Sequence, residues 1–365
     1  MIGFLFNPFQ ALLKDKKLTV DVKLFSFLIF LLPLALISGP ALPDIILSII
    51  ALYFLILSFV KKLWSYYKNK FVYFFLIFSV FIILRAIFSD FPYSSLLNEG
   101  SVFYFRYLFF ILGVWYLIDK NKYLSKCLLA ILILCLVVTS INGLKQYFFH
   151  IDFFGNERFS EDRLSGFFFG EPIIGRYISS LSIFTFALIY REFKNNKTKI
   201  LFSSVMIFVS LVMVFMTGER APLFNILLFV VLVFIFYKNY RFFFISGFCL
   251  SCLILFITVL FNPSAKERII DLTYVQMTDT KIPLLPYSEI HERHYITAIR
   301  MFIDKPLIGV GTNLFRNMCN NHKYHYKQLS CSTHPHNIYI QLLAETGILG
   351  FLFLFIYLIY LSSLI

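Results

Sequence analysis

The sequence is poor in charge and rich in apolar residues. Charged residues make up 15% of the chain, whereas about 25% is usual in a soluble globular protein. Hydrophobic residues make up 59%, and the mean hydropathy is +0.79. Long apolar runs recur along the whole length, which excludes a soluble domain with a single anchor. The first run also lacks a following small-residue cleavage site, so we expect a retained helix and not a removed signal peptide.

Other absences narrow the function. We find no internal repeat of the kind that marks inverted-repeat transporters, and no low-complexity linker divides the chain. Gly309-Val310-Gly311 lacks the rest of a dinucleotide fingerprint and the lysine of a phosphate loop. His291 and His294 are three residues apart, whereas the zinc-protease helix motif places its histidines four apart.

The apolar runs predict about ten membrane-spanning helices, since about 20 apolar residues span the hydrocarbon core. The expected spans are 20–38, 41–60, 71–88, 102–118, 124–143, 172–190, 200–217, 222–237, 242–261 and 338–361. We therefore predict an all-α fold: a single transmembrane domain over residues 1–365, a polytopic helix bundle. One large extracytoplasmic loop, residues 262–335, precedes the last helix.

The net charge of +13 would suit a nucleic-acid partner, but topology explains it better, because basic residues hold loops in the cytoplasm. With the N-terminus inside, the basic clusters all fall on one side. They are Lys14, Lys16, Lys17 and Lys23; Lys61, Lys62, Lys68 and Lys70; Lys120, Lys122 and Lys126; Arg191, Lys194, Lys197 and Lys199; Lys238 and Arg241. We expect no nucleic-acid partner.

Two outer segments are too long to be plain turns, residues 145–171 and 262–335. All seven histidines lie in these segments or at their edges, so we expect any chemistry on the outer face. Within the second segment, residues 289–304 have the spacing of an amphipathic helix, and a glycine-rich turn follows at 306–311. Cys319 and Cys331 could form a disulfide there, because the outer face is oxidising. Zinc held by these cysteines with His322 and His325 is the alternative.

Arginines on the outer side are unexpected under the same topology. Arg85, Arg106 and Arg176 lie at helix ends, and Arg220 lies in a very short turn between two helices. An arginine at membrane depth costs roughly 2.5–3.5 kcal/mol, and its planar fork suits phosphate oxygens. The alternative is that each one reaches the headgroups or pairs with a nearby acid. The candidate acids are Asp90, Glu99, Glu171 and Glu219.

His336 stands where the outer polar segment gives way to the last apolar run. A histidine there could act as a general base, since its pKa lies near working pH. The alternative is that His336 and Asn337 only form the cap of the helix that follows.

Three passages resemble the O-antigen ligase and polymerase superfamily of bacterial membrane glycosyltransferases, and a weaker match is Arg163-Leu164-Ser165-Gly166-Phe167. The three are Thr217-Gly218-Glu219-Arg220-Ala221, residues 293–311, and His334-Pro335-His336-Asn337 through Gly350. Members of this family usually continue for another helix or two after the histidine-bearing helix, whereas this sequence stops at Ile365.

The resemblance implies a membrane glycosyltransferase that takes a glycan from an undecaprenyl diphosphate carrier. The acceptor is a lipid A core sugar for an O-antigen ligase, which we favour, or a second lipid-linked repeat unit for a polymerase. A transporter of the same lipid is a further alternative, disfavoured because the charges gather at the outer edge. The implied location is the bacterial inner membrane, with the active site on the periplasmic face in contact with membrane lipids.

The same resemblance suggests roles for particular residues. We expect His336 to take the proton from the acceptor hydroxyl or to orient that hydroxyl, and Arg220 and Arg293 to hold the diphosphate. Arg300, Arg176, His334 and Asn337 are the further substrate-binding candidates. No cofactor and no metal ion is expected, because the arginines supply the positive charge.

Overall fold

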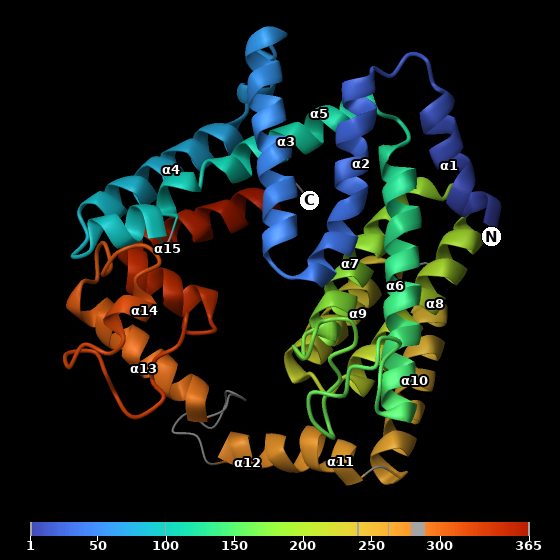
Figure 1. The fold of residues 1–365 in the computed structure, drawn as a ribbon. Coiled ribbons are helices and arrows are strands. Elements are labelled where there is room, and N and C mark those ends of the chain that lie inside the picture. Colours follow the sequence, from blue (N-terminus) through green and yellow to red (C-terminus); the bar gives the residue numbers. More distant parts are fainter. Residues whose placement is uncertain (1, 99, 239–240, 262, 279–288, 364–365) are drawn as a thin grey trace. The chain divides into compact units, whose positions relative to one another are not determined.

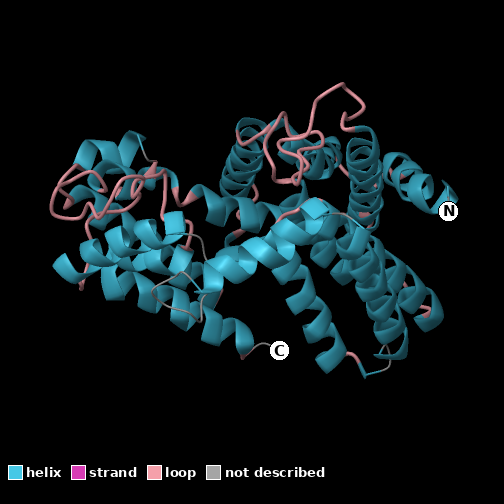
Figure 2. Cartoon of the chain, turned by 90° about the horizontal axis from the view of Figure 1, so that it is seen from below, coloured by secondary structure: helices cyan, strands magenta, loops and turns pink. Residues whose placement is uncertain are grey.

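The computed structural model describes residues 2–98, 100–238, 241–261, 263–278 and 289–363, all of them in helices, turns and loops (Figures 1 and 2). No strand occurs among these residues, where β-type pairing is limited to two isolated bridges, Ile151 with Glu157 and Ser160 with Arg163. Contacts divide the chain into two compact units. Unit 1 comprises Met1–Ile50 and Val114–Thr273, and unit 2 comprises Ala51–Gly113 and Tyr274–Ile365. The prediction of one transmembrane domain stays a prediction.

Each of the ten predicted spans coincides with a helix. These helices are α2 (Val20–Ala35), α3 (Ala41–Val60), α4 (Lys70–Ile87), α5 (Arg106–Lys120), α6 (Leu124–Phe149), α7 (Ile174–Glu192), α8 (Asn196–Met216), α9 (Arg220–Phe236), α10 (Arg241–Phe261) and α15 (Ile338–Ser362). Seven spans in the described part of the chain are long and apolar enough to cross a membrane, while α9 is a shorter apolar helix. The predicted all-α, multi-pass membrane fold is confirmed.

The remaining helices are short or lie in the segments between spans. They are α1 (Ile2–Lys14), α11 (Pro263–Lys266), α12 (Leu272–Thr278), α13 (Glu289–Asp304) and α14 (Phe315–Met318), with short 3-10 or π turns at Leu36–Ser38, Trp64–Tyr67, Ser94–Asn98, Ser101–Phe103 and Glu267–Asp271. The amphipathic helix predicted at 289–304 is therefore confirmed as α13. Helix α1 was not predicted, because it is too short to span a membrane and contains Pro8.

Asparagine caps fix the starts of three of the long helices. Asn69 begins α4, Asn195 begins α8 and Asn337 begins α15. In each case the side-chain oxygen accepts a hydrogen bond from a backbone N–H of the first turn, and such a cap is worth about 1 kcal/mol.

Unit 1 has an apolar core formed by α6, α7, α8 and α9. Its fully buried members include Ile174 and Ile178 on α7, Leu211 and Val214 on α8, and Ile226 on α9. Small polar side chains also join helices: the Ser182 hydroxyl donates to the Ser210 hydroxyl at 2.6 Å, from α7 to α8. Such contacts satisfy polar groups that lipid cannot.

Unit 2 contains a second core beneath α13, α14 and the first half of α15, which lie together in Figure 1. Met301 from α13, Phe315 from α14 and Ala344 from α15 are all fully buried in this core, with Val310 and Leu314 from the connecting loop. Residues 289–335 of the large predicted loop are therefore a folded, packed element, and this element packs on α15.

Helix α15 is broken at Gly347, where the backbone has φ 65° and ψ −165°. The loop 306–311 pairs with the opened backbone along both sides of the break. The N–H of Val310 donates to Ala344 O at 2.9 Å, and the N–H of Ile348 donates to Pro306 O at 2.8 Å. An uninterrupted helix was expected, but glycine adopts left-handed φ readily and the loop supplies the partners that the helix loses.

Arg85 completes this junction from the end of α4. Its side chain is 5% exposed and donates to three carbonyl oxygens at 2.7 Å, those of Ile308, Gly309 and Phe88. Arg85 thus satisfies the backbone of the glycine turn. These hydrogen bonds account for Arg85, which is one of the outer arginines considered as phosphate-binding candidates.

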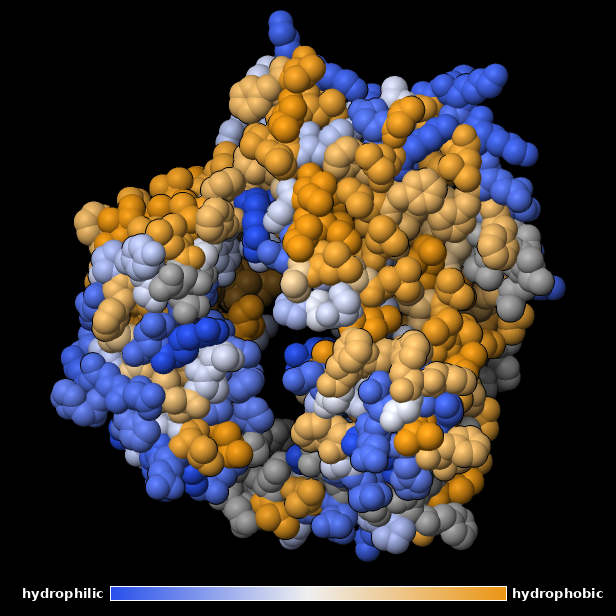
Figure 3. Space-filling model, in the orientation of Figure 1, coloured by the Kyte–Doolittle hydropathy of each residue, from blue (hydrophilic) through white to orange (hydrophobic). Residues whose placement is uncertain are grey.

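The helices present apolar side chains outward. On the face drawn in Figure 3, hydrophobic residues cover broad areas of the helices. Among the exposed large residues are Leu52 and Phe59 of α3, Ile77 of α4 and Phe355 of α15. Apolar surface on this scale suits contact with lipid, because a soluble protein rarely exposes it.

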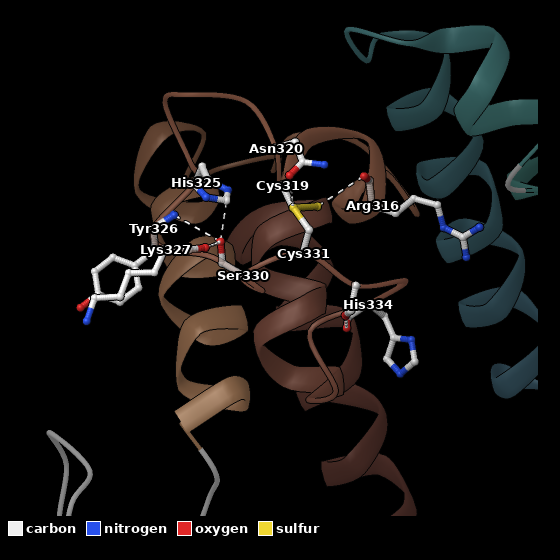
Figure 4. Close-up of a disulfide and its surroundings, with 10 residues drawn as sticks. Arg316, Cys319, Asn320, His325, Tyr326, Lys327, Ser330, Cys331 and His334 are labelled. Carbon is white, nitrogen blue, oxygen red and sulfur yellow. Dashed lines mark hydrogen bonds between the residues drawn. A yellow bond between two sulfur atoms is a disulfide. The ribbon is translucent and has the colours of Figure 1, made fainter. Parts of the chain in front are cut away.

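A disulfide joins Cys319 to Cys331, with their Cα atoms 5.3 Å apart (Figure 4). Of the two alternatives left open by the sequence, the cysteines form the disulfide. Cys319 belongs to the core of unit 2, and Cys331 lies three residues before His334. The bond therefore ties the histidine-bearing segment to α14.

Gly309→Ala should destabilise the protein more than Gly155→Ala. Both glycines have positive φ, but a Cβ at Gly309 would lie 2.2 Å from the carbonyl carbon of Glu345, whereas at Gly155 nothing lies within 4 Å. We expect a cost of about 1–2 kcal/mol for backbone strain at Gly155 and about 1–3 kcal/mol more at Gly309. Thermal unfolding of the detergent-solubilised variants measures this difference. Equal losses would show that the close approach of loop 306–311 to α15 is not required.

Replacing Cys319 and Cys331 together by serine should lower stability by about 3 kcal/mol, because the disulfide closes a loop with a sequence separation of 12. The thermal midpoint of the wild type should fall on addition of a reductant, and that of the double variant should not. A matched double variant at the free cysteines Cys249 and Cys252 should keep the response of the wild type. A wild type indifferent to reductant would contradict the expectation.

Candidate functional site

Four histidines meet in unit 2. His291 and His294 come from α13, and His334 and His336 come from the segment before α15. The ring of His336 lies 5.3 Å from that of His291, 5.4 Å from that of His294 and 4.3 Å from that of His334, measured between ring centres. His336 is therefore the member in ring contact with all three others.

His294 is the buried member of this histidine cluster, with 4% of its surface exposed. Burial lowers the pKa of His294, and the nearby rings of His291 and His334 lower it further, while a hydrogen bond to the backbone of Leu329 works in the other direction. Its Nδ1 atom is buried with no hydrogen-bond partner among the described residues. Burial and the neighbouring rings therefore disfavour the charged form of His294 beside His336.

His336 occupies an unusual backbone position directly before the helix cap. Its φ is 59°, a left-handed value that non-glycine residues adopt rarely and that is often found at functional sites. The side chain is exposed. Asn337 follows as the cap of α15, its oxygen accepting from the N–H groups of Tyr339 and Ile340. Asn337 supplies the helix cap, and His336 supplies the exposed imidazole. The helix-cap and general-base interpretations of this pair are therefore compatible.

His334 is exposed, and its Nδ1 lies 2.9 Å from the hydroxyl of Thr333. In Figure 4 its ring points away from the disulfide. The disulfide and the local hydrogen bonds hold the turn, and the imidazole stays on the surface.

Arg293 lies on α13 between His291 and His294 in sequence. It donates to Glu289 at 2.5 Å and to the carbonyl of Gln328 at 2.8 Å, and its Nε is buried with no partner among the described residues. The hydrogen bond from Arg293, together with its charge, lowers the pKa of Glu289. Arg300, two turns further along, is exposed, donates to His325 O at 2.6 Å and lies over the ring of Tyr326. Two positive charges therefore follow α13, one beside the histidine cluster and one further along.

Unit 1 contains the other two predicted arginines, at the turn between α8 and α9. Arg220 is the first residue of α9, and one of its terminal nitrogens donates to the hydroxyl of Thr273 at 3.2 Å. Arg176 is exposed in the first turn of α7. The described geometry places these two in unit 1, and His336, His334, Asn337, Arg293 and Arg300 in unit 2.

Glu219 is the buried acidic residue of this turn, and it interacts with the charges of Arg163 and Arg176. It is 6% exposed and accepts the backbone N–H of Gly175 at the start of α7. Burial raises the pKa of Glu219, while the Gly175 N–H and the charges of Arg163 and Arg176 oppose the rise. A buried carboxyl among arginines orders the turn that carries Arg220.

Close backbone approach holds the same turn against the loop that carries Arg163. Gly218 has φ 71°, and a Cβ there would lie 1.9 Å from the carbonyl oxygen of Asp162. The N–H of Leu164 donates to Thr217 O at 3.3 Å. Two of the passages that carried the family resemblance are therefore packed together.

A pocket of about 330 Å³ lies in unit 2 between α4 and α15. Apolar and aromatic residues line most of it, and its polar lining residues are Thr312, Asn313, Glu345 and Thr346. Glu345 is buried and accepts the N–H of Phe315 at 3.1 Å. The shape and lining suit a long apolar chain, because such sites are mostly apolar with a few fixed polar groups.

Sequence reasoning missed the part played by two histidines and one acid. His291 and His294 were considered only as a zinc motif, although three-residue spacing puts both on one face of a helix, which was a usable signal. Glu219 was considered only as one of several counter-charges. No group of three or more histidine, cysteine or acidic side chains in the described part of the chain is arranged to hold a metal ion.

Part of the chain is similar to a known protein family. The family model described as O-antigen ligase matches residues 205–355, and no curated protein and no solved structure matches the chain. The matched segment includes every predicted site residue except Arg176, and with it the histidine cluster, the Gly347 break and the α8–α9 turn. Residues 205–355 of this multi-pass membrane protein are therefore similar to the O-antigen ligase family.

Proposed function

We propose that the protein is an O-antigen ligase, which transfers a glycan from undecaprenyl diphosphate to a sugar of the lipid A core on the periplasmic face of the inner membrane. The observation that carries the proposal is His336, which is exposed directly before α15 within the histidine cluster and lies in the same unit as Arg293. The family match over this segment supports it.

In the proposed reaction His336 takes the proton of the acceptor hydroxyl. The acceptor oxygen then bonds to the anomeric carbon of the donor sugar, the bond from that carbon to the diphosphate breaks, and undecaprenyl diphosphate leaves with the electron pair. A base with its pKa near working pH suits this step. The imidazole returns its proton to water when the product leaves.

Arginines supply the positive charge for the leaving diphosphate in this proposal, without a metal ion. A guanidinium binds phosphate oxygens through two parallel hydrogen bonds. Arg293 lies between His291 and His294 in the sequence of α13, and one buried N–H of its guanidinium is not used within the described residues. Roles for Arg220, Arg176, Arg300, His334 and Asn337 stay predictions, with Arg220 and Arg176 in unit 1 around Glu219.

The disulfide supports a periplasmic location for this site. Disulfides form and persist outside the cytoplasm, and the one between Cys319 and Cys331 lies in the segment that carries His334 and His336. The basic clusters predicted on the cytoplasmic side agree with the same orientation.

A polymerase would share the donor chemistry and differ in the acceptor, a second lipid-linked repeat unit. The length distribution of the surface glycan separates the two functions. A host that lacks a ligase accumulates finished polymer on the carrier lipid, whereas a host that lacks a polymerase attaches single repeats. Restoration of polymer attachment by this chain supports the ligase; restoration of chain length contradicts it.

His336→Ala should lower glycan transfer by roughly 10²- to 10⁴-fold, the usual contribution of a general base. The assay measures transfer in a host lacking its own enzyme, at equal membrane levels of the variants. His322→Ala is the matched control, since His322 is exposed in the same segment and outside the histidine cluster. Full activity of His336→Ala at normal levels would refute the catalytic role.

We further propose that the pocket between α4 and α15 holds part of the carrier's isoprenoid tail. Leu354→Trp adds bulk to its lining, whereas Leu352→Trp adds the same bulk to an exposed position of α15 outside the lining. We expect Leu354→Trp to raise the KM for the lipid donor about tenfold, corresponding to about 1.4 kcal/mol, and Leu352→Trp to leave it unchanged. Equal donor KM values for the two variants would remove the tail from this pocket.

A further inference from the structure

The histidine cluster holds four imidazole rings close together, with His336 in ring contact with each of the other three. Ring-centre distances from His336 to its three neighbours run from 4.3 to 5.4 Å, and His291 lies 6.2 Å from His294. Each imidazole that gains a proton becomes a positive charge facing the others. Like charges at such distances disfavour one another, so the protons of the cluster cannot bind independently.

The size of this coupling follows from the distances. Two unit charges 5.4 Å apart shift one another's titration by about 0.5 pH units in water and about 2 pH units at an effective dielectric constant of 20. His294 is buried and His334 and His336 are exposed, so the coupling lies between these values. Either value is large enough to measure.

The surroundings offer limited compensation for a second or third proton. The other ionisable side chains on α13, on the segment between α14 and α15 and on the start of α15 are Glu289, Glu292, Arg293, Tyr295, Arg300, Asp304, His322, Lys323, Tyr324, His325, Tyr326, Lys327, Tyr339 and Glu345. Asp304 is paired with Lys323. Of the acids, Glu289 is paired with Arg293, and Glu345 accepts from Phe315 and Gln341. Glu292 is buried in the first turn of α13. Arg293 adds a further positive charge on the same helix.

We propose that His291, His294, His334 and His336 bind protons as one coupled cluster, in which the three neighbouring imidazoles keep His336 neutral and able to accept a proton under mildly acidic conditions. His294 is the positioning residue of the cluster: its buried ring is held on α13 and stands against His336 at a fixed 5.4 Å. The proton coupling does not depend on the proposed function. Its consequence for glycan transfer depends on the proposed function.

The first measurement follows the proton directly, with no glycan present. The full-length protein in nanodiscs, with ¹⁵N-labelled histidines, is titrated by NMR, and the His336 signal is identified by its loss in His336→Gln. His334→Asn removes an exposed neighbour and should fold normally, while His294→Asn removes the buried one. His334→Asn should raise the titration midpoint of His336 by about 0.5 pH units or more, and His294→Asn should raise it by less, because burial already disfavours the charged form of His294. His322→Asn, outside the cluster, should leave it unchanged.

A His336 midpoint that stays within about 0.2 pH units of the wild type in both cluster variants would overturn the coupling, whatever the activity. The second measurement is the pH profile of glycan transfer. Its acid limb, where His336 takes up a proton, should move to higher pH in His334→Asn by the same amount as the NMR midpoint. A merely structural loss would lower the rate at every pH without moving the limb. If the midpoint moves and the limb does not, the cluster stands and the proposed role of His336 as base fails.

Discussion

The backbone junction between loop 306–311 and the break in α15 is the interaction on which unit 2 depends. A membrane helix that opens its hydrogen-bond ladder must find other partners, because lipid supplies none. Here the loop provides them on both sides of Gly347, and Arg85 satisfies the carbonyls that the loop itself turns away. Glycine is required at positions 309 and 347. At each of them the backbone of the other segment lies too close to leave room for a Cβ.

This junction sets the geometry of the candidate site. Because the loop follows α13 directly, docking it on α15 brings α13 against the start of the same helix. The disulfide fixes the segment that returns from α14 to α15, and Asn337 fixes where α15 begins. His291 and His294 are placed by α13, and His334 and His336 by the returning segment, so the histidine cluster forms where these restraints converge.

In unit 1 charged side chains help to hold the turn between two helices in place. The turn between α8 and α9 is three residues long and is packed against the loop carrying Arg163 and the start of α7. Glu219 is buried there, and its cost of burial is offset by the Gly175 N–H and by the arginines around it. The result is a rigid turn that starts α9 with Arg220. In both units, backbone contacts that only glycine permits hold arginine-bearing elements in place.

The sequence by itself determined the helices, since each apolar run of sufficient length became one, and residues 289–304 became α13 through their three- and four-residue spacing. It also identified His336 with Asn337 and the short turn at Arg220, because these are local patterns. Only the tertiary structure decided the break at Gly347, the use of Arg85 on backbone carbonyls, and the meeting of His291 and His294 with His336. Those features depend on contacts between residues far apart in the chain, whose formation is governed by packing and by the need to satisfy backbone groups, and no local periodicity records them.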